Sequence, residues 1–229
     1  MVTTLLLARH GLTDLTGPVL AGRTPGVSLS GEGRAQARAL AARIAGVRLD
    51  AIVASPLERC QETAAAVAEG RDLPVVTEER LIECGYGEWT GRPLKELAEE
   101  PLWPVVQSHP SAAVFPGGEA LADVQHRAVA AVREWNLRLG EKAVYLACSH
   151  GDVIKAIVAD ALGLHLDHFQ RIASDPAALT VIRYTPLRPF VLRLNDMGEL
   201  RLAEDAGEKS GGENSTGSDA AVGGGSGTT

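Results

Sequence analysis

The chain has 229 residues, of which 45% are apolar and 4% aromatic, and its formal net charge at pH 7 is −7. The length and apolar content are typical of a soluble globular protein with a sizeable core. The low aromatic content and the negative charge disfavour nucleic acid and anionic membranes as partners, and no apolar run reaches the roughly 18 residues of a transmembrane helix.

Strand-like apolar runs alternate with helix-like segments along the chain. The predicted strands are residues 3–8, 51–54, 74–77, 143–148, 179–184 and 190–194, with a short edge strand at 199–202 as a further candidate. The predicted helices are residues 30–46, 55–69, 93–99, 119–139 and 152–162. This alternation predicts a three-layer α/β/α fold with a mostly parallel, doubly wound sheet and a small helical cap inserted at about residues 83–140.

Two of the predicted helices carry start signals. Ser30 is placed to cap a helix whose apolar positions follow the 3.6-residue period and which Gly46 ends. Ser55 is predicted as an N-cap, with Pro56 at the first helical position and Glu58 completing a capping box.

The three cysteines are odd in number and form no CxxC pair. They indicate neither a disulfide framework nor a zinc site, and we interpret Cys60, Cys84 and Cys148 as small buried side chains. The apolar run Leu5–Leu7 is too short for a signal-peptide core. We therefore expect a cytoplasmic protein.

The last 27 residues differ in composition from the rest. Residues 203–229 hold five acidic residues, one basic residue and eight of the 25 glycines, which leaves a net charge of −3 on residues 1–202. With almost no large apolar side chain, this segment cannot offset the entropy lost on ordering. We predict one domain at 1–202 followed by a disordered acidic tail.

Basic residues and histidines follow the predicted strands where those strands end. Arg9 and His10 follow the first strand, Arg59 lies one helical turn after the second, and His150 follows the strand at 143–148. In a doubly wound sheet the ligand sits outside the carboxyl ends of the strands. These four side chains are therefore expected to converge at one edge.

The predicted cluster suits a phosphoryl group. Arginine forks bind phosphate oxygens, and a neutral imidazole nitrogen is a nucleophile that can take the phosphoryl group. Arginines and a second histidine can stabilise the transferred charge without a metal. The leaving alkoxide needs a proton, for which Glu83 and Asp152 are the candidates by position.

Five ordered segments resemble the blocks of the histidine phosphatase superfamily, the phosphoglycerate-mutase-like proteins. They are Arg-His-Gly-Leu-Thr at 9–13, ASPLERCQETA at 54–64, LIECGYGEWTG at 81–91, FPGGE at 115–119 and Ser-His-Gly at 149–151. The resemblance covers about residues 3–194.

The resemblance implies a role for each matching residue. His10 would be the phosphorylated nucleophile, and Arg9, Arg59 and His150 would bind the phosphoryl oxygens. Glu83 would be the general acid and later the base that activates water. Thr13 would support the first loop, and Gly11 and Gly151 belong to the phosphate-binding motifs. The resemblance implies no metal and no organic cofactor.

The sequence departs from the family pattern at a few positions. Thr16 stands where members often carry asparagine, Ala120 replaces the serine of the PGGES segment, and Asp152 is a less usual residue after Ser-His-Gly. We consider Arg23, Thr16 and Asp152 as further substrate contacts.

Three functions remain open from the sequence. Only 67 positions separate Glu83 from His150, whereas the bisphosphoglycerate-dependent mutases that this chain resembles normally have a longer insertion there. A shorter cap leaves the site more open to water, which favours a phosphatase acting on a small phosphorylated metabolite. A mutase must exclude water from its phosphoenzyme. A bisphosphoglycerate-dependent phosphomutase and a non-catalytic phosphoryl-binding regulator are the alternatives. The expected assembly is a monomer or a homodimer.

Overall fold

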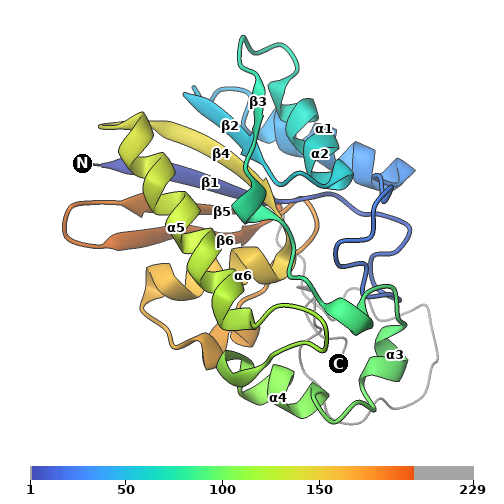
Figure 1. Cartoon of the computed structure of the whole chain (residues 1–229). Helices are drawn as coiled ribbons and strands as arrows, with labels where there is room; N and C mark the ends of the chain where they lie inside the picture. The colour runs from blue at the N-terminus through green and yellow to red at the C-terminus, as the bar shows by residue number, and fades with distance from the viewer. Residues whose placement is uncertain (1, 199–229) are drawn as a thin grey trace.

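A computed structural model describes residues 2–198, in which helices cover both faces of a six-stranded sheet (Figure 1). The strands are β1 (Thr3–Arg9), β2 (Ala51–Ala54), β3 (Val75–Thr77), β4 (Val144–Ser149), β5 (Leu179–Tyr184) and β6 (Pro189–Asp196). The α-helices are α1 (Gly31–Arg43), α2 (Glu58–Ala68), α3 (Leu94–Leu97), α4 (Trp103–Ser108), α5 (Leu121–Leu139) and α6 (Gly151–Leu162). The 3-10 helices are η1 (Glu79–Leu81), η2 (Gly87–Trp89), η3 (Pro110–Ala112) and η4 (Leu166–Arg171).

The sheet is parallel in its first four strands and antiparallel in the last two. Its order is β3-β2-β4-β1-β5-β6, with β3, β2, β4 and β1 parallel and β5 antiparallel to both β1 and β6. The short hairpin loop at 185–188 permits only an antiparallel β5–β6 pair, whereas crossover helices connect the parallel strands. The predicted α/β class with a mostly parallel sheet is confirmed.

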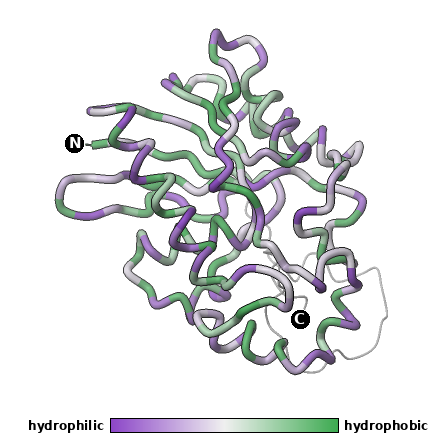
Figure 2. The backbone as a smooth tube through the Cα atoms, in the orientation of Figure 1, coloured by the Kyte–Doolittle hydropathy of each residue, from purple (hydrophilic) through white to green (hydrophobic). Residues whose placement is uncertain are grey.

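Two hydrophobic clusters lie on the two faces of the sheet. One cluster joins α1 and α2 to side chains such as Leu6, Ile52 and Leu146. The other joins α5 and α6 to the opposite face, where Leu5 and Tyr145 lie. The tube of α5 alternates between hydrophilic and hydrophobic colours (Figure 2), as expected for a helix with one buried face.

The predicted cap range contains two different parts. Helix α5 packs against the sheet, through contacts such as Trp135 on Tyr145 with ring centroids 6.5 Å apart. Residues 83–120 carry only the short helices η2, α3, α4 and η3, which lie beyond the end of the sheet (Figure 1). Helix α4 is absent from the predicted elements; its Pro104 lies in the first turn, where proline is tolerated.

The two predicted helix starts have different outcomes. Ser30 caps α1 as predicted and accepts a hydrogen bond from the amide of Gly33 at 3.0 Å. This helix ends at Arg43, before the predicted Gly46. The capping box at Ser55 is wrong: α2 begins at Glu58 with Leu57 as an uncapped N-cap residue.

Two further expectations lie outside the described residues. The candidate edge strand at 199–202 and the acidic tail at 203–229 both fall beyond residue 198. Within residues 2–198, no helix is both long and apolar enough to cross a bilayer.

Candidate active site

The side chains predicted to form the site come together at the carboxyl edge of the parallel strands. Strands β1, β2 and β4 are paired so that their last residues lie side by side. Arg9 and His10 lie at the end of β1, His150 directly follows β4, and Arg59 lies in the first turn of α2. Glu83 lies in the loop after η1, and all five side chains are buried, none more than 7% exposed.

A close backbone contact places the loop that carries His10. A Cβ added to Gly11 would lie 2.5 Å from the carbonyl oxygen of Gly33, and one added to Gly33 would lie 1.9 Å from that of Leu12. Only glycine fits at either position, so the loop after β1 lies directly on the start of α1. The Gly11 amide donates to the Thr63 hydroxyl of α2 at 3.1 Å, which fixes the loop from the other side.

The hydrogen bonds of His10 define which ring nitrogen can attack. Nδ1 lies 2.7 Å from the carbonyl oxygen of Gly11, which can only accept, so Nδ1 carries the proton. Nε2 therefore keeps its lone pair and accepts from Nε of Arg59 at 3.2 Å. Burial, then the charges of Arg59 and Arg9, hold the His10 pKa well below its usual value. The ring is neutral at neutral pH, as a nucleophile requires.

His150 faces His10 in the same cluster of buried side chains. The two ring centroids are 5.2 Å apart at an interplanar angle of 62°. An Nη2 hydrogen of Arg59 points to Nδ1 of His150 at 3.3 Å, so Nε2 carries the proton and donates to Oγ of Ser55 at 2.7 Å. Burial, followed by Arg59, lowers the His150 pKa well below its usual value.

Arg59 contacts both histidines, and one of its nitrogens makes no hydrogen bond among the described residues. Its Nη2 also donates to the carbonyl oxygen of Gly22 at 2.7 Å, while Nη1 is buried with no hydrogen-bond partner among the described residues. A buried unsatisfied donor is costly unless a ligand satisfies it. Arg9 is held from the other side, where Nη1 donates to the Ser174 carbonyl at 2.6 Å.

We expect Ser55→Ala to weaken the site by freeing the His150 ring. The Ser55 hydroxyl is fully buried and accepts the Nε2 proton of His150, so its loss leaves the ring oriented by Arg59 alone. We predict a fall of about 10-fold to 100-fold in kcat/KM, by analogy with lost orienting partners of functional histidines. Steady-state kinetics with a phosphomonoester measure the effect. Ser108→Ala, which removes an exposed hydroxyl of α4, is the control, and equal rates in both variants would contradict the assigned role.

Glu83 is a buried carboxyl group that interacts with the charges of Arg9 and Arg59 in the same cluster. Its Oε1 accepts from the Cys84 amide at 2.8 Å. Burial, followed by the nearby charge of Asp152, raises the pKa of Glu83 to about 7, against the opposing effects of the Cys84 amide, Arg59 and Arg9. Near neutral pH this group can therefore donate a proton and also accept one, which suits a group that acts as both acid and base.

Arg23 braces the backbone at Glu83. Its Nε donates to the Glu83 carbonyl at 2.7 Å, and its Nη2 pairs with Oε2 of Glu119. Arg127 binds the same carboxylate through Nε and Nη2 at 3.0 and 3.1 Å and reaches the Glu83 carbonyl at 3.2 Å. Glu119 also accepts from the Gly85 amide at 2.8 Å. The Glu119 carboxylate, the last residue of the FPGGE segment, thus joins both arginines to the loop that carries Glu83.

The remaining predicted site residues lie in the turn after the first loop and at the start of α6. Thr13 and Thr16 hydrogen-bond to each other, with 2.9 Å between their hydroxyl oxygens, so Thr16 closes the turn after the first loop. Gly151 is the buried first residue of α6, whose N-terminus faces the edge of the sheet. Asp152 is fully buried and accepts from the Tyr86 hydroxyl at 2.7 Å.

Several side chains around the candidate site have no role that the sequence predicts. The sequence predicts Ser55 as a cap, whereas its hydroxyl contacts His150, and it predicts no role for Tyr86, Glu119 or Lys155. Glu119 and Tyr86 lie inside the quoted motifs, which was the available signal. The three cysteines are buried, as interpreted, and Cys60 Sγ lies 3.4 Å from Nε2 of His150. In residues 2–198 no three His, Cys, Asp or Glu side chains are grouped to hold a metal ion.

Comparisons with known proteins agree on one family. The sequence model described as histidine phosphatase superfamily (branch 1) matches residues 5–197. Phosphoserine phosphatase 1 of Hydrogenobacter thermophilus is 34% identical over 199 residues, covering 83% of this chain and 91% of that protein. Glucosyl-3-phosphoglycerate phosphatase of Mycolicibacterium vanbaalenii is 32% identical over 177 residues, covering 73% and 78%. The solved structure of Bacillus stearothermophilus YhfR superposes with a TM-score of 0.79 at 31% identity, covering 85% of this chain and 97% of that one.

Proposed function

The chain belongs to the histidine phosphatase superfamily, branch 1, and on this premise we propose that it hydrolyses a small phosphomonoester through a phosphohistidine at His10. The observation that carries the proposal is the lone pair of His10 Nε2, held in a pocket with Arg59 and His150. The relatives whose names give an activity are named as phosphatases of small phosphorylated metabolites, phosphoserine and glucosyl-3-phosphoglycerate.

The first step transfers the phosphoryl group to the protein. Arg9 and Arg59 bind its oxygens, and the unpartnered Nη1 of Arg59 gains an acceptor. His150 joins them once the phosphate charge favours protonation of its Nδ1 by solvent, since its other ring proton is already donated to Ser55. Those oxygens compete with His10 for the donors of Arg59, which releases the Nε2 lone pair. The N–P bond forms as the ester P–O bond breaks, and Glu83 gives its proton to the leaving oxygen.

The second step releases inorganic phosphate. Glu83, now a carboxylate, takes a proton from a water molecule whose oxygen attacks phosphorus. The N–P bond breaks, its electron pair returns to Nε2 of His10, and Glu83 is protonated again. The pKa of about 7 allows the same group to serve in both steps near neutral pH.

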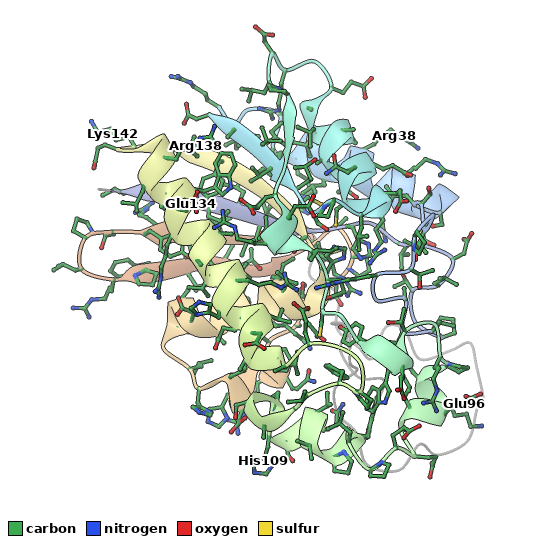
Figure 3. The ribbon with its side chains drawn as sticks, in the orientation of Figure 1. Arg38, Glu96, His109, Glu134, Arg138 and Lys142 are labelled. Carbon is green, nitrogen blue, oxygen red and sulfur yellow. The ribbon has the colours of Figure 1, made fainter. Side chains whose placement is uncertain are left out.

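We propose that residues 83–120, whose short helices lie beyond the end of the sheet (Figure 1), determine which substrate the site accepts. Loops on a rigid scaffold usually carry specificity, and this segment begins at Glu83 itself and contains α3 and α4. His109, which lies in this segment, is exposed and points away from the molecule at its lower edge (Figure 3). Arg92 is paired with Glu100 at 2.7 Å.

An assay of the purified protein with a panel of phosphomonoesters tests the proposal. The panel includes phosphoserine, sugar phosphates, nucleotides and phosphoglycerates, and we expect free phosphate from at least one of them. Incubation with 3-phosphoglycerate and a trace of 2,3-bisphosphoglycerate tests the mutase alternative. Rapid formation of 2-phosphoglycerate without free phosphate would make the protein a mutase, and no reaction with any substrate would support a non-catalytic role.

A further inference from the structure

Three buried ionisable side chains whose charges interact with Glu83 have no role in the proposed mechanism. Asp152 and Lys155 come from the first turns of α6, and Tyr86 comes from the loop that carries Glu83. These three side chains are 0–1% exposed. Charged groups are rarely buried unless neighbours compensate for their lost hydration, so this cluster needs a structural or functional reason.

The Asp152 carboxylate is held at a fixed place by Tyr86. The Tyr86 hydroxyl donates to Oδ2 of Asp152 at 2.7 Å. Burial, and then the charges of Asp152 and Glu83, raise the pKa of Tyr86 well above its usual value, so the hydroxyl keeps its proton and remains a donor. The Tyr86 ring packs edge-on against Phe115, with centroids 5.0 Å apart. Tyr86 thus links Asp152 to the loop of Glu83, three residues after Glu83 itself.

Lys155 supplies positive charge one helical turn after Asp152. Its Nζ donates to Oε1 of Gln170 at 2.7 Å and lies 5.3 Å from the centre of the Phe169 ring. Burial lowers the pKa of Lys155, and the Asp152 charge opposes that effect. The Tyr86 hydroxyl and the positive charges of Lys155 and Arg9 therefore compensate for the burial of Asp152.

The other groups around Glu83 act mostly in the opposite sense to Asp152. Arg9 from β1, Arg59 from α2 and Lys155 from α6 favour the charged carboxylate, as does the Cys84 amide. Arg23 and Arg127 bind the backbone carbonyl of Glu83. His10 and His150 are neutral at neutral pH, since their pKa values lie well below the usual range. Among these groups, the anion that faces Glu83 is Asp152, on α6.

We propose that Asp152 is a positioning residue that keeps the proton on Glu83 until the leaving group takes it, while Tyr86 holds the Asp152 carboxylate in place. A like charge behind a buried carboxyl favours its neutral form. Burial is the larger cause of the raised Glu83 pKa, but without Asp152 the two arginines would shift Glu83 further toward the carboxylate and leave a smaller fraction able to donate a proton. The inference rests on the proposed function, in which Glu83 is the general acid.

The titration of Glu83 itself tests this role without any substrate. Protein labelled with 13C at glutamate carboxyls is titrated by NMR, and Glu83→Gln identifies the Glu83 resonance. Removal of the like charge by Asp152→Asn stabilises the Glu83 carboxylate, so we expect its titration midpoint to fall by about one pH unit. An unchanged midpoint in a folded variant overturns the proposal.

The pH profile of turnover gives a second readout. The protonated form of Glu83 is needed to expel an alkoxide, so kcat/KM for an alkyl phosphate falls as pH rises through the Glu83 pKa. Asp152→Asn moves this alkaline limb about one pH unit lower, which is roughly a tenfold loss on that limb. Hydrolysis of the phosphoenzyme needs the carboxylate form and extends to lower pH. A purely structural defect would lower both rates at every pH without moving either limb, and that result overturns the proposal.

Two further variants keep the test decisive. Tyr86→Phe removes only the hydroxyl that holds Asp152, and we expect the Glu83 midpoint and the pH limbs to shift in the same direction by a smaller amount. This variant provides the test if Asp152→Asn does not fold. Asp160→Asn removes a carboxylate from the same helix, where Asp160 pairs with Arg133 at 3.1 Å, and should leave the Glu83 midpoint unchanged. If wild-type protein shows no phosphatase activity, the proposed function fails, while the NMR titration still decides the role of Asp152.

Discussion

His10→Ala protein is expected to lose at least about 10³-fold in kcat toward every phosphomonoester and to form no phosphoprotein, because removal of a covalent nucleophile abolishes both steps of the reaction. In the wild-type protein, brief exposure to substrate carrying labelled phosphate should leave label on His10 that is stable to alkali and lost in acid. The buried ring contributes Nε2 as the acceptor of the phosphoryl group, and alanine has no replacement for it.

A second histidine controls for the loss of an imidazole. His126 is exposed on α5, and His126→Ala should keep both the activity and the label. Thermal unfolding of the two variants shows whether either change disturbs the fold. Full turnover by a folded His10→Ala protein, or label recovered on another residue, would reject His10 as the nucleophile.

The place of His10 was predictable because it follows from local pattern and sheet topology. Short apolar runs identify β1 and β4, and parallel strands bring their carboxyl ends to one edge, so Arg9, His10 and His150 had to be neighbours. The glycine after His10 has an equally physical reason, since its Cβ would collide with the backbone of Gly33.

The supporting contacts were not predictable because they join residues far apart in the chain. Ser55 precedes a helix and matches the local capping pattern, yet its hydroxyl bonds to His150, 95 positions later. A tertiary contact, rather than the local capping pattern, therefore determines where the Ser55 hydroxyl binds. Lys155 stands in a mostly apolar stretch of α6, which marks it as a candidate buried charge, but its partner Gln170 is identified only by the fold of η4.

For Glu83, too, the local sequence predicts the position, whereas contacts from distant segments determine the protonation. The LIECGYGEWTG segment places Glu83 near the site, but its protonation depends on Asp152 from α6 and on arginines from β1 and α2. Burial of the carboxyl group is the largest of these effects, and burial is a property of the packed molecule rather than of the segment. Sequence therefore predicts which carboxyl group lies in the site, whereas the structure explains why it can hold a proton at neutral pH.

Glu83→Gln is expected to slow hydrolysis of alkyl phosphates by about 10²-fold to 10⁴-fold, the usual contribution of a positioned general acid. An alkoxide is a strong base and cannot leave without a proton, whereas nitrophenolate is weakly basic and can. The variant should therefore still transfer phosphate from 4-nitrophenyl phosphate to His10 and release a burst of nitrophenol equal to the enzyme present. Without the carboxylate that activates water, phosphohistidine then accumulates.

The rates of the two half-reactions, measured separately, decide whether Glu83 has both roles. Glu88→Gln, an exposed change on the same loop, is the matched control and should leave both rates unchanged. In the wild-type protein the rate with an alkyl phosphate should fall above the Glu83 pKa of about 7, because the proton donor is then lost, and Glu83→Gln should remove that dependence. Equal slowing of phosphoryl transfer from alkyl and nitrophenyl phosphates would refute the acid role. Rapid loss of the burst phosphohistidine would refute the base role and assign water activation to another group.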